Sequence, residues 1–79
     1  MRPAPTIKVT NHGKFVIEAS AEIREGLWFS EFQILADRQV AMPWQSPGGP
    51  GLQTEQLALD MAFETAIRDI ENGLAAIFS

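Results

Sequence analysis

Apolar and polar side chains alternate with a period of two from Thr6 to about Ala36, and this alternation constrains the fold more than any other feature of the sequence. In a β-strand successive side chains point to opposite faces of the sheet, so the period predicts strands with one buried face. An isolated hairpin is marginal in water, so such a sheet needs a second layer over its apolar face. The clearest run of apolar positions is Phe15, Ile17, Ala19, Ala21 and Ile23.

The first turn of the predicted sheet contains Asn11-His12-Gly13. These residues suit a three-residue hairpin loop with Gly13 in the left-handed conformation, which glycine adopts without steric cost. The loop would set Val9 opposite Phe15 and would place the apolar residues of both strands on the same face.

The second turn, Glu25-Gly26, predicts a two-residue hairpin connection. On the face expected to be buried, this register sets the small Ala19 opposite the large Phe32, as close packing requires. On the other face it sets Val16 opposite Leu35, which makes an apolar cross-strand pair. The turn and both faces therefore agree on one hairpin.

A short fourth strand is predicted at Val40-Ala41-Met42, ended by Pro43, which a sheet tolerates at an edge or a bulge. Its register depends on the length of the turn at Asp37-Arg38. A two-residue turn places Val40, Met42 and Trp44 on the open face of the sheet, whereas a three-residue turn points them beneath the helix. We favour the register with the three-residue turn, because a tryptophan side chain is more often buried than exposed to solvent.

From Thr54 onward the apolar period changes to 3.6, which predicts an amphipathic helix over Glu55 to Phe78 with Thr54 as its N-cap. Such a helix would be about 36 Å long. A compact domain of this size is only roughly 30 Å across, so we expect the helix to bend, fray or stop near Asn72-Gly73. The apolar stripe consists of Leu59, Phe63, Ala66, Ile67, Ile70, Leu74 and Ile77.

These elements predict an α+β fold, in which an antiparallel meander of three or four strands carries one C-terminal helix on one face. The chain has 79 residues, which allows one domain. The expected parts of this single domain, 1–79, are a tail at 1–5, a β-meander at 6–44, a Pro/Gly loop at 45–53 and a helix at 54–78.

Composition argues against most catalytic chemistry. Cysteine is absent and His12, in the first turn, is the only histidine, so no thiolate or second imidazole is available. The Pro/Gly loop precedes a helix, but Pro47 and Pro50 lack backbone N–H donors and Glu55 places negative charge where a phosphate would bind. We therefore expect no catalytic residue, no cofactor and no metal, and a protein that is not an enzyme.

The charge of the chain is acidic, with a net value of −4. Nucleic-acid binding needs a clustered positive surface, so a nucleic-acid-binding module is an alternative that the charge does not favour. The longest apolar stretch, Leu74 to Phe78, is far too short to span a membrane, and we expect a cytoplasmic protein. The six basic residues are scattered along the chain: Arg2, Lys8, Lys14, Arg24, Arg38 and Arg68.

More apolar side chains occur on the strands than one helix can cover. Val16, Phe29 and Leu35 are expected on the face away from the helix, and Trp44 would join them if the turn at Asp37-Arg38 has two residues. Contiguous exposed apolar area on a small domain usually marks an interface. We therefore expect a protein that acts by protein–protein association, as a homodimer or as an accessory subunit, and we infer no small-molecule ligand.

The order of elements supports two resemblances. A Trp-bearing strand at Leu27-Trp28-Phe29-Ser30, a Pro/Gly loop and a final amphipathic helix make the chain resemble short uncharacterised bacterial proteins with the same layout. The helix beginning Thr54-Glu55-Gln56-Leu57-Ala58 is also similar to the helix that follows the meander in HicB-type antitoxins. That second resemblance implies a basic ribonuclease toxin as partner, although the Pro-Asp-Leu-Pro-Gly stretch typical of the family is replaced here by Gly49-Pro50-Gly51.

Overall fold

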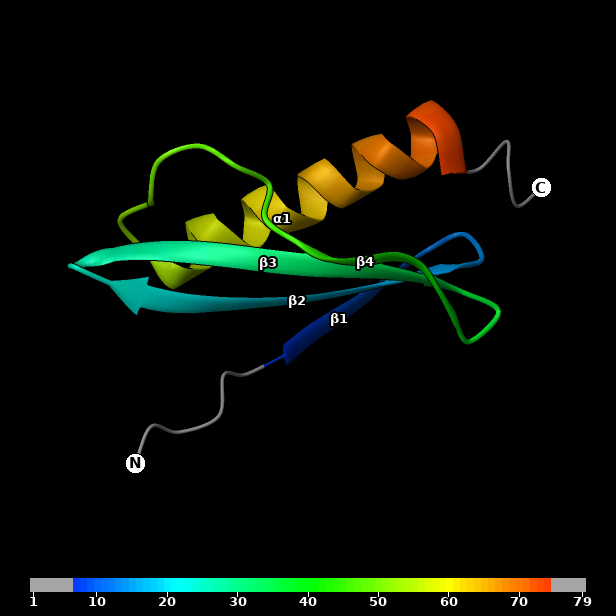
Figure 1. The fold of residues 1–79 in the computed structure, drawn as a ribbon, viewed down its shortest axis with the longest axis horizontal. Helices are drawn as coiled ribbons and strands as arrows, with labels where there is room; N and C mark the ends of the chain where they lie inside the picture. The colour runs from blue at the N-terminus through cyan, green and yellow to red at the C-terminus, as the bar shows by residue number, and fades with distance from the viewer. Residues whose placement is uncertain (1–6, 75–79) are drawn as a thin grey trace.

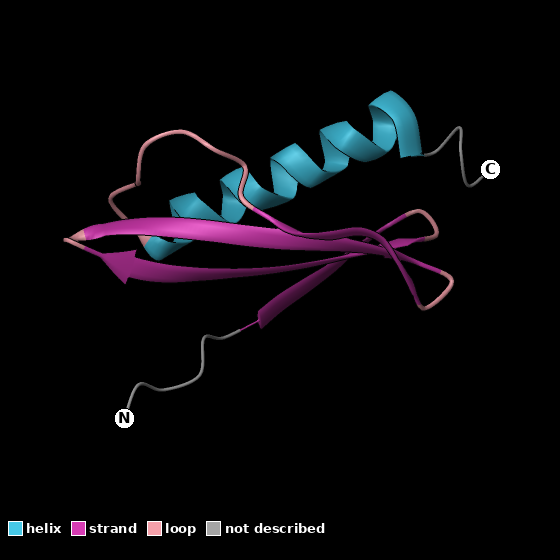
Figure 2. Cartoon of the chain, viewed as in Figure 1, coloured by secondary structure: helices cyan, strands magenta, loops and turns pink. Residues whose placement is uncertain are grey.

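The computed structural model describes residues 7–74 and confirms the α+β class. Four antiparallel strands follow one another in the sheet in the order β1-β2-β3-β4, and one helix lies across a single face (Figures 1 and 2). The expected tail at 1–5 and the end of the helix at 75–78 lie outside the described residues. The elements are β1 (Ile7–His12), β2 (Phe15–Arg24), β3 (Leu27–Ala36), β4 (Gln39–Gln45), α1 (Glu55–Asp69) and a π-helical turn, η1 (Ile70–Leu74).

The β2–β3 hairpin has the predicted register. Ala19 pairs with Phe32 and Val16 pairs with Leu35, and the connecting turn is Glu25-Gly26. Both turn residues have positive φ, 53° and 81°, as the two-residue turn that matches the twist of a hairpin requires.

The predicted register of β1 is wrong. The turn consists of Gly13-Lys14 rather than three residues, so His12 pairs with Phe15 and Val9 pairs with Glu18. The shift is by an odd number of residues, which moves Val9 and Ile7 to the face away from the helix. The helix packs on β2 and β3 rather than on β1. Turning the apolar side chains of β1 toward the helix side would therefore gain little burial.

Strand β4 combines the two registers that the sequence left open. The turn at Asp37-Arg38 has two residues, so Val40 pairs with Leu35 and lies on the open face. One register shift then sets Met42 opposite Ile34 on the helix side. A second shift sets Gln45 opposite Phe32, which leaves Trp44 on the open face. The favoured register is therefore right for Met42 and wrong for Val40 and Trp44, because each bulge adds one residue and reverses the face that follows it.

The helix turns its small side chains toward the sheet. Ala58, Ala62 and Ala66 are buried, and they allow α1 to approach the large residues of β2 and β3, such as Phe32. Phe63, which the period placed on the central stripe, is only partly buried at the flank of the helix. The core therefore lies over β2 and β3, and its main members are Phe15, Ile17, Ala19, Phe32, Ile34, Ala36, Leu59, Ala62, Ala66 and Ile70.

Both predicted helix boundaries have a structural counterpart. The hydroxyl of Thr54 accepts a hydrogen bond from the backbone N–H of Leu57 at 3.1 Å, which confirms the N-cap. The α-helix ends at Asp69 and continues as the π-helical turn, which contains the Asn72-Gly73 pair where a break was expected. No helix within residues 7–74 is long and apolar enough to cross a membrane.

The Pro/Gly loop returns to the sheet beside β3. The backbone N–H of Trp28 donates to the carbonyl of Leu52 at 2.7 Å, and the N–H of Leu52 donates back to Trp28 at 2.8 Å. This bridge pairs the part of β3 that β4 does not reach. It holds Gly51 directly against Leu27 and Phe29.

Candidate interaction surface on the open sheet face

An apolar row crosses three strands on the face of the sheet away from α1. Val16 of β2 pairs with Leu35 of β3, and Leu35 pairs with Val40 of β4. Val16 and Leu35 are half-buried, whereas Val40 is 56% exposed. We call this face, with Ile7, Val9, Val16, Leu35, Val40 and Trp44 as its apolar members, the open face.

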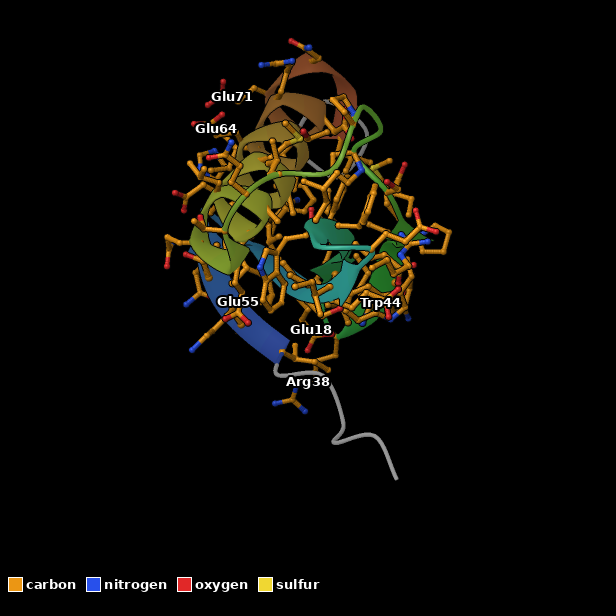
Figure 3. All side chains as sticks on the ribbon, turned by 90° about the vertical axis from the view of Figure 1, so that its left-hand side faces the viewer. Glu18, Arg38, Trp44, Glu55, Glu64 and Glu71 are labelled. Carbon is orange, nitrogen blue, oxygen red and sulfur yellow. The ribbon has the colours of Figure 1, made fainter. Side chains whose placement is uncertain are left out.

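The next row of the open face is mixed. Val9 pairs with Glu18, and Glu18 pairs with Gln33, whose side-chain amide donates a hydrogen bond to the Glu18 carboxylate. Because Gln45 pairs with Phe32 on the helix side, strand alternation places Trp44 on the open face near Gln33. Figure 3 shows Glu18 and Trp44 on the side of the sheet away from α1. The row therefore has apolar ends and a hydrogen-bonded polar centre.

Three of the four interface residues expected from the sequence lie together on this surface: Val16, Leu35 and Trp44. Phe29 lies apart from them, six residues from Leu35 along β3, which is about 20 Å in an extended strand. The guanidinium of Arg24 lies 4.3 Å from the centre of the Phe29 ring, and Gly51 packs against the same ring. Phe29 is therefore partly covered by its own chain.

Sequence reasoning missed Ile7 and Val9 as members of the open face. They are 51% and 58% exposed, and Val9 is the most exposed large apolar side chain among the described residues. The signal that could have placed them is the Gly13-Lys14 pair, because glycine at the first position of a two-residue turn is a strong hairpin signal.

Polar groups of the described residues gather at two other places, near the end of the β2–β3 hairpin and between β1 and η1. A hollow of about 120 Å³ near the end of the β2–β3 hairpin includes Glu22, Arg24 and Ser30, but Arg24 is already stacked on Phe29 and lies 3.4 Å from the Glu22 carboxylate. His12 Nε2 lies 3.5 Å from a carboxylate oxygen of Glu71, which joins the end of β1 to η1. Residues 7–74 contain no group of three or more side chains suited to hold a metal ion.

Comparison of the chain with models of known protein families, with curated proteins and with solved structures finds no match. No relative therefore bears on the resemblances drawn from the layout of the sequence. The arrangement of side chains on the open face remains the basis for a functional inference.

Proposed function

We propose that this protein is a non-enzymatic association module that forms a homodimer through the open face. The observation that carries the proposal is the contiguous apolar row Val16–Leu35–Val40, flanked in the next row by Val9 of β1 and Trp44 of β4. Burial of such apolar area against a partner stabilises the complex by about 25 cal/mol for each Å² removed from water.

The size of the open face suits a small interface. Four strands at a spacing of about 4.8 Å and a mean length of about 27 Å give a projected area of about 500 Å². A standard interface buries about 800 Å² of accessible surface on each partner, and the accessible area of a textured surface exceeds its projection. We therefore expect a dimer that dissociates on dilution rather than an obligate one.

A second copy of the chain is a suitable occupant because the open face is complementary to itself. A two-fold axis parallel to the strands, between β2 and β3, stacks β2 on β3 of the second copy and β1 on β4 of the second copy. Val16 then meets Leu35 of the second copy, and Val9 meets Trp44 of the second copy. Two packed sheets are offset by about 30°, which preserves these neighbours near the axis.

The charged residues are compatible with the same arrangement. Glu18 meets Gln33 of the second copy, the residue type with which it already forms a hydrogen bond within one chain. Further along the strands, Glu22 meets Phe29 and Glu31 meets Ser20 of the second copy. No two carboxylates oppose each other in this stacking, so it avoids the like-charge repulsion that would disfavour a dimer.

The test is sedimentation of the purified chain from micromolar to millimolar concentration. We expect the wild-type mass to rise toward that of a dimer, and the double variant Val9→Glu with Val40→Glu to remain monomeric. Both sites are more than half exposed, at 58% and 56%, so the variant should fold.

A matched control is the double variant Ile23→Glu with Leu57→Glu, whose sites are 56% and 50% exposed but lie off the open face. It adds the same charge and should still dimerise. A wild-type chain that stays monomeric throughout the concentration range, or a control that loses dimerisation equally, would show that the open face is not the interface.

A further inference from the structure

A groove runs between β1 and α1 on the side of the sheet opposite the open face. Its volume is about 500 Å³. It exists because α1 is centred over β2 and β3, so that the helix flank overhangs β1 without packing on it. The side chains that line it are Lys8 and Thr10 from β1, and Gln56, Leu59, Phe63 and Ile67 from α1.

The floor of the groove is the free edge of the sheet. Strand β1 is the first in the sheet order and pairs only with β2 among the described residues. Val9 also lines the groove, although its pairing with Glu18 directs its side chain to the open face. We infer that Val9 contributes backbone there, so that hydrogen-bonding groups of the β1 edge face the groove.

The helical wall of the groove is apolar at its centre and acidic along its rim. Phe63 and Ile67 are only partly buried and face the groove. Figure 3 shows Glu55, Glu64 and Glu71 on the side of α1 and η1 that overlooks β1. Within residues 7–74, neither Glu55 nor Glu64 forms an ion pair, whereas Glu71 contacts His12. Glu55 and Glu64 therefore give the rim negative charge that no ion pair neutralises within residues 7–74, while Lys8 adds one positive charge on the β1 side of the groove.

We propose that this groove binds an extended segment of a partner protein, which adds to β1 as a fifth strand. Side chains of an added strand alternate between the two faces of the sheet, so every second one points along the helix wall. In the centre of the segment these side chains are apolar and cover Phe63 and Ile67. At its two ends they are arginine or lysine and meet the acidic rim.

A second copy of β1 does not suit this groove. If β1 of another molecule extended the sheet with both helices on the same face, the strand would direct Lys8, Thr10 and His12 of that copy along the helix wall. None of these side chains is apolar, so Phe63 and Ile67 would stay uncovered. The proposal concerns a different partner from the homodimer of the open face, and it holds whether or not that dimer forms.

The probe is a fluorescent heptapeptide, Arg-Thr-Val-Thr-Val-Thr-Arg, titrated into the full chain with anisotropy as the readout. Two further peptides separate the contributions: one with glutamate at both ends, and one with serine in place of both valines. We expect each to bind at least tenfold more weakly than the first. Equal binding of all three peptides would contradict the proposed recognition.

A charge reversal on the protein provides the sharper test. The double variant Glu55→Lys with Glu64→Lys changes exposed side chains and should fold normally. It should bind the glutamate-ended peptide more tightly than the arginine-ended one, which reverses the wild-type order. The matched control Glu22→Lys with Glu25→Lys, at the distant β2–β3 turn, makes the same charge change and should keep the wild-type order. An unchanged preference in the double variant would overturn the proposal.

Hydrogen exchange tests whether the peptide adds as a strand. Saturation with the arginine-ended peptide should slow exchange of the β1 backbone amides by at least tenfold, because an added strand accepts hydrogen bonds from the edge. The amides of β4, at the other edge of the sheet, should be unaffected. Binding that leaves β1 exchange unchanged would contradict addition to the sheet.

Discussion

The substitution Gly51→Ala should destabilise the fold, although it adds only one methyl group. A Cβ at this position would lie 2.6 Å from Cβ of Leu27 and 2.7 Å from Cζ of Phe29. Comfortable contacts between carbon atoms are about 3.5–4.0 Å, so the overlap is about 1 Å. The Phe29 ring can turn away, but the Cβ of Leu27 is fixed to the backbone of β3. The loop must therefore retreat from the strand.

The cost of that retreat follows from what the loop holds. The next residue, Leu52, forms two backbone hydrogen bonds with Trp28 at 2.7 and 2.8 Å. A displacement of about 1 Å weakens both, at about 1 kcal/mol each, and residual overlap adds about 1 kcal/mol more. We expect a loss of about 2–3 kcal/mol in the free energy of unfolding. For a domain of this size this lowers Tm by about 10 °C or more.

Thermal and urea unfolding of wild type and variant, followed by circular dichroism, measure the effect. The matched control is Gly73→Ala, where an added Cβ meets nothing within 4 Å and the backbone does not have positive φ. This control should leave stability unchanged or slightly increase it. A Gly51→Ala protein that unfolds within about 2 °C of wild type, well below the shift expected from the lost contacts, would refute the reasoning.

Three further substitutions test other parts of the fold by the same unfolding measurements. Ala62→Leu places a larger side chain at a fully buried position between α1 and the sheet, and should cost about 2–3 kcal/mol. Thr54→Ala removes the N-cap hydrogen bond and should cost about 1 kcal/mol, whereas the neighbouring exposed Gln53→Ala should be neutral. Arg38→Gly relieves a non-glycine residue at φ 65° in the β3–β4 turn and should stabilise by about 0.5–1 kcal/mol.

The β2–β3 hairpin could be predicted from the sequence because three independent features specify it. The Glu25-Gly26 turn, the size match of Ala19 with Phe32, and the apolar pair Val16 and Leu35 all require one register. The N-cap at Thr54 could also be predicted, because its signal is local. A hydroxyl just before an amphipathic run accepts a hydrogen bond from a backbone N–H of the same helical turn.

The register of β1 could not be obtained from the alternation alone. The prediction assumed that Val9 must face the helix, but burial is available only where the helix lies, and α1 covers β2 and β3. The three alanines of α1 set that position, because they allow the closest approach where the sheet carries large side chains. Helix placement is a tertiary property, so the alternation within β1 could not show which of its faces is buried, and only the Gly13-Lys14 turn carried a local signal for the register.

The predicted register of β4 was wrong in part for a different reason. Its two register shifts lie on either side of Met42, one between Val40 and Met42 and one between Met42 and Gln45, and each reverses the side to which the following residues point. The proline marked an irregularity, but a period of two carries no information on how many extra residues a strand inserts. Val40 and Met42 consequently lie on opposite faces, which neither of the two simple registers allowed. Val40 lies on the open face as the two-residue turn predicted, and the structure was needed to show that Met42 does not follow it there.

Strand β1 adds little to the core of residues 7–74: Ile7, Lys8 and Val9 are exposed, and no β1 side chain is among the buried ones. It is retained chiefly by its ladder with β2 and by the contact of His12 with Glu71. Native proteins open first where side-chain packing is sparse. The first strand can therefore detach while the other strands and the helix stay folded. Its transient release would expose the unpaired backbone edge of β2. Strand exchange between two molecules could begin at that edge without unfolding the rest of the domain.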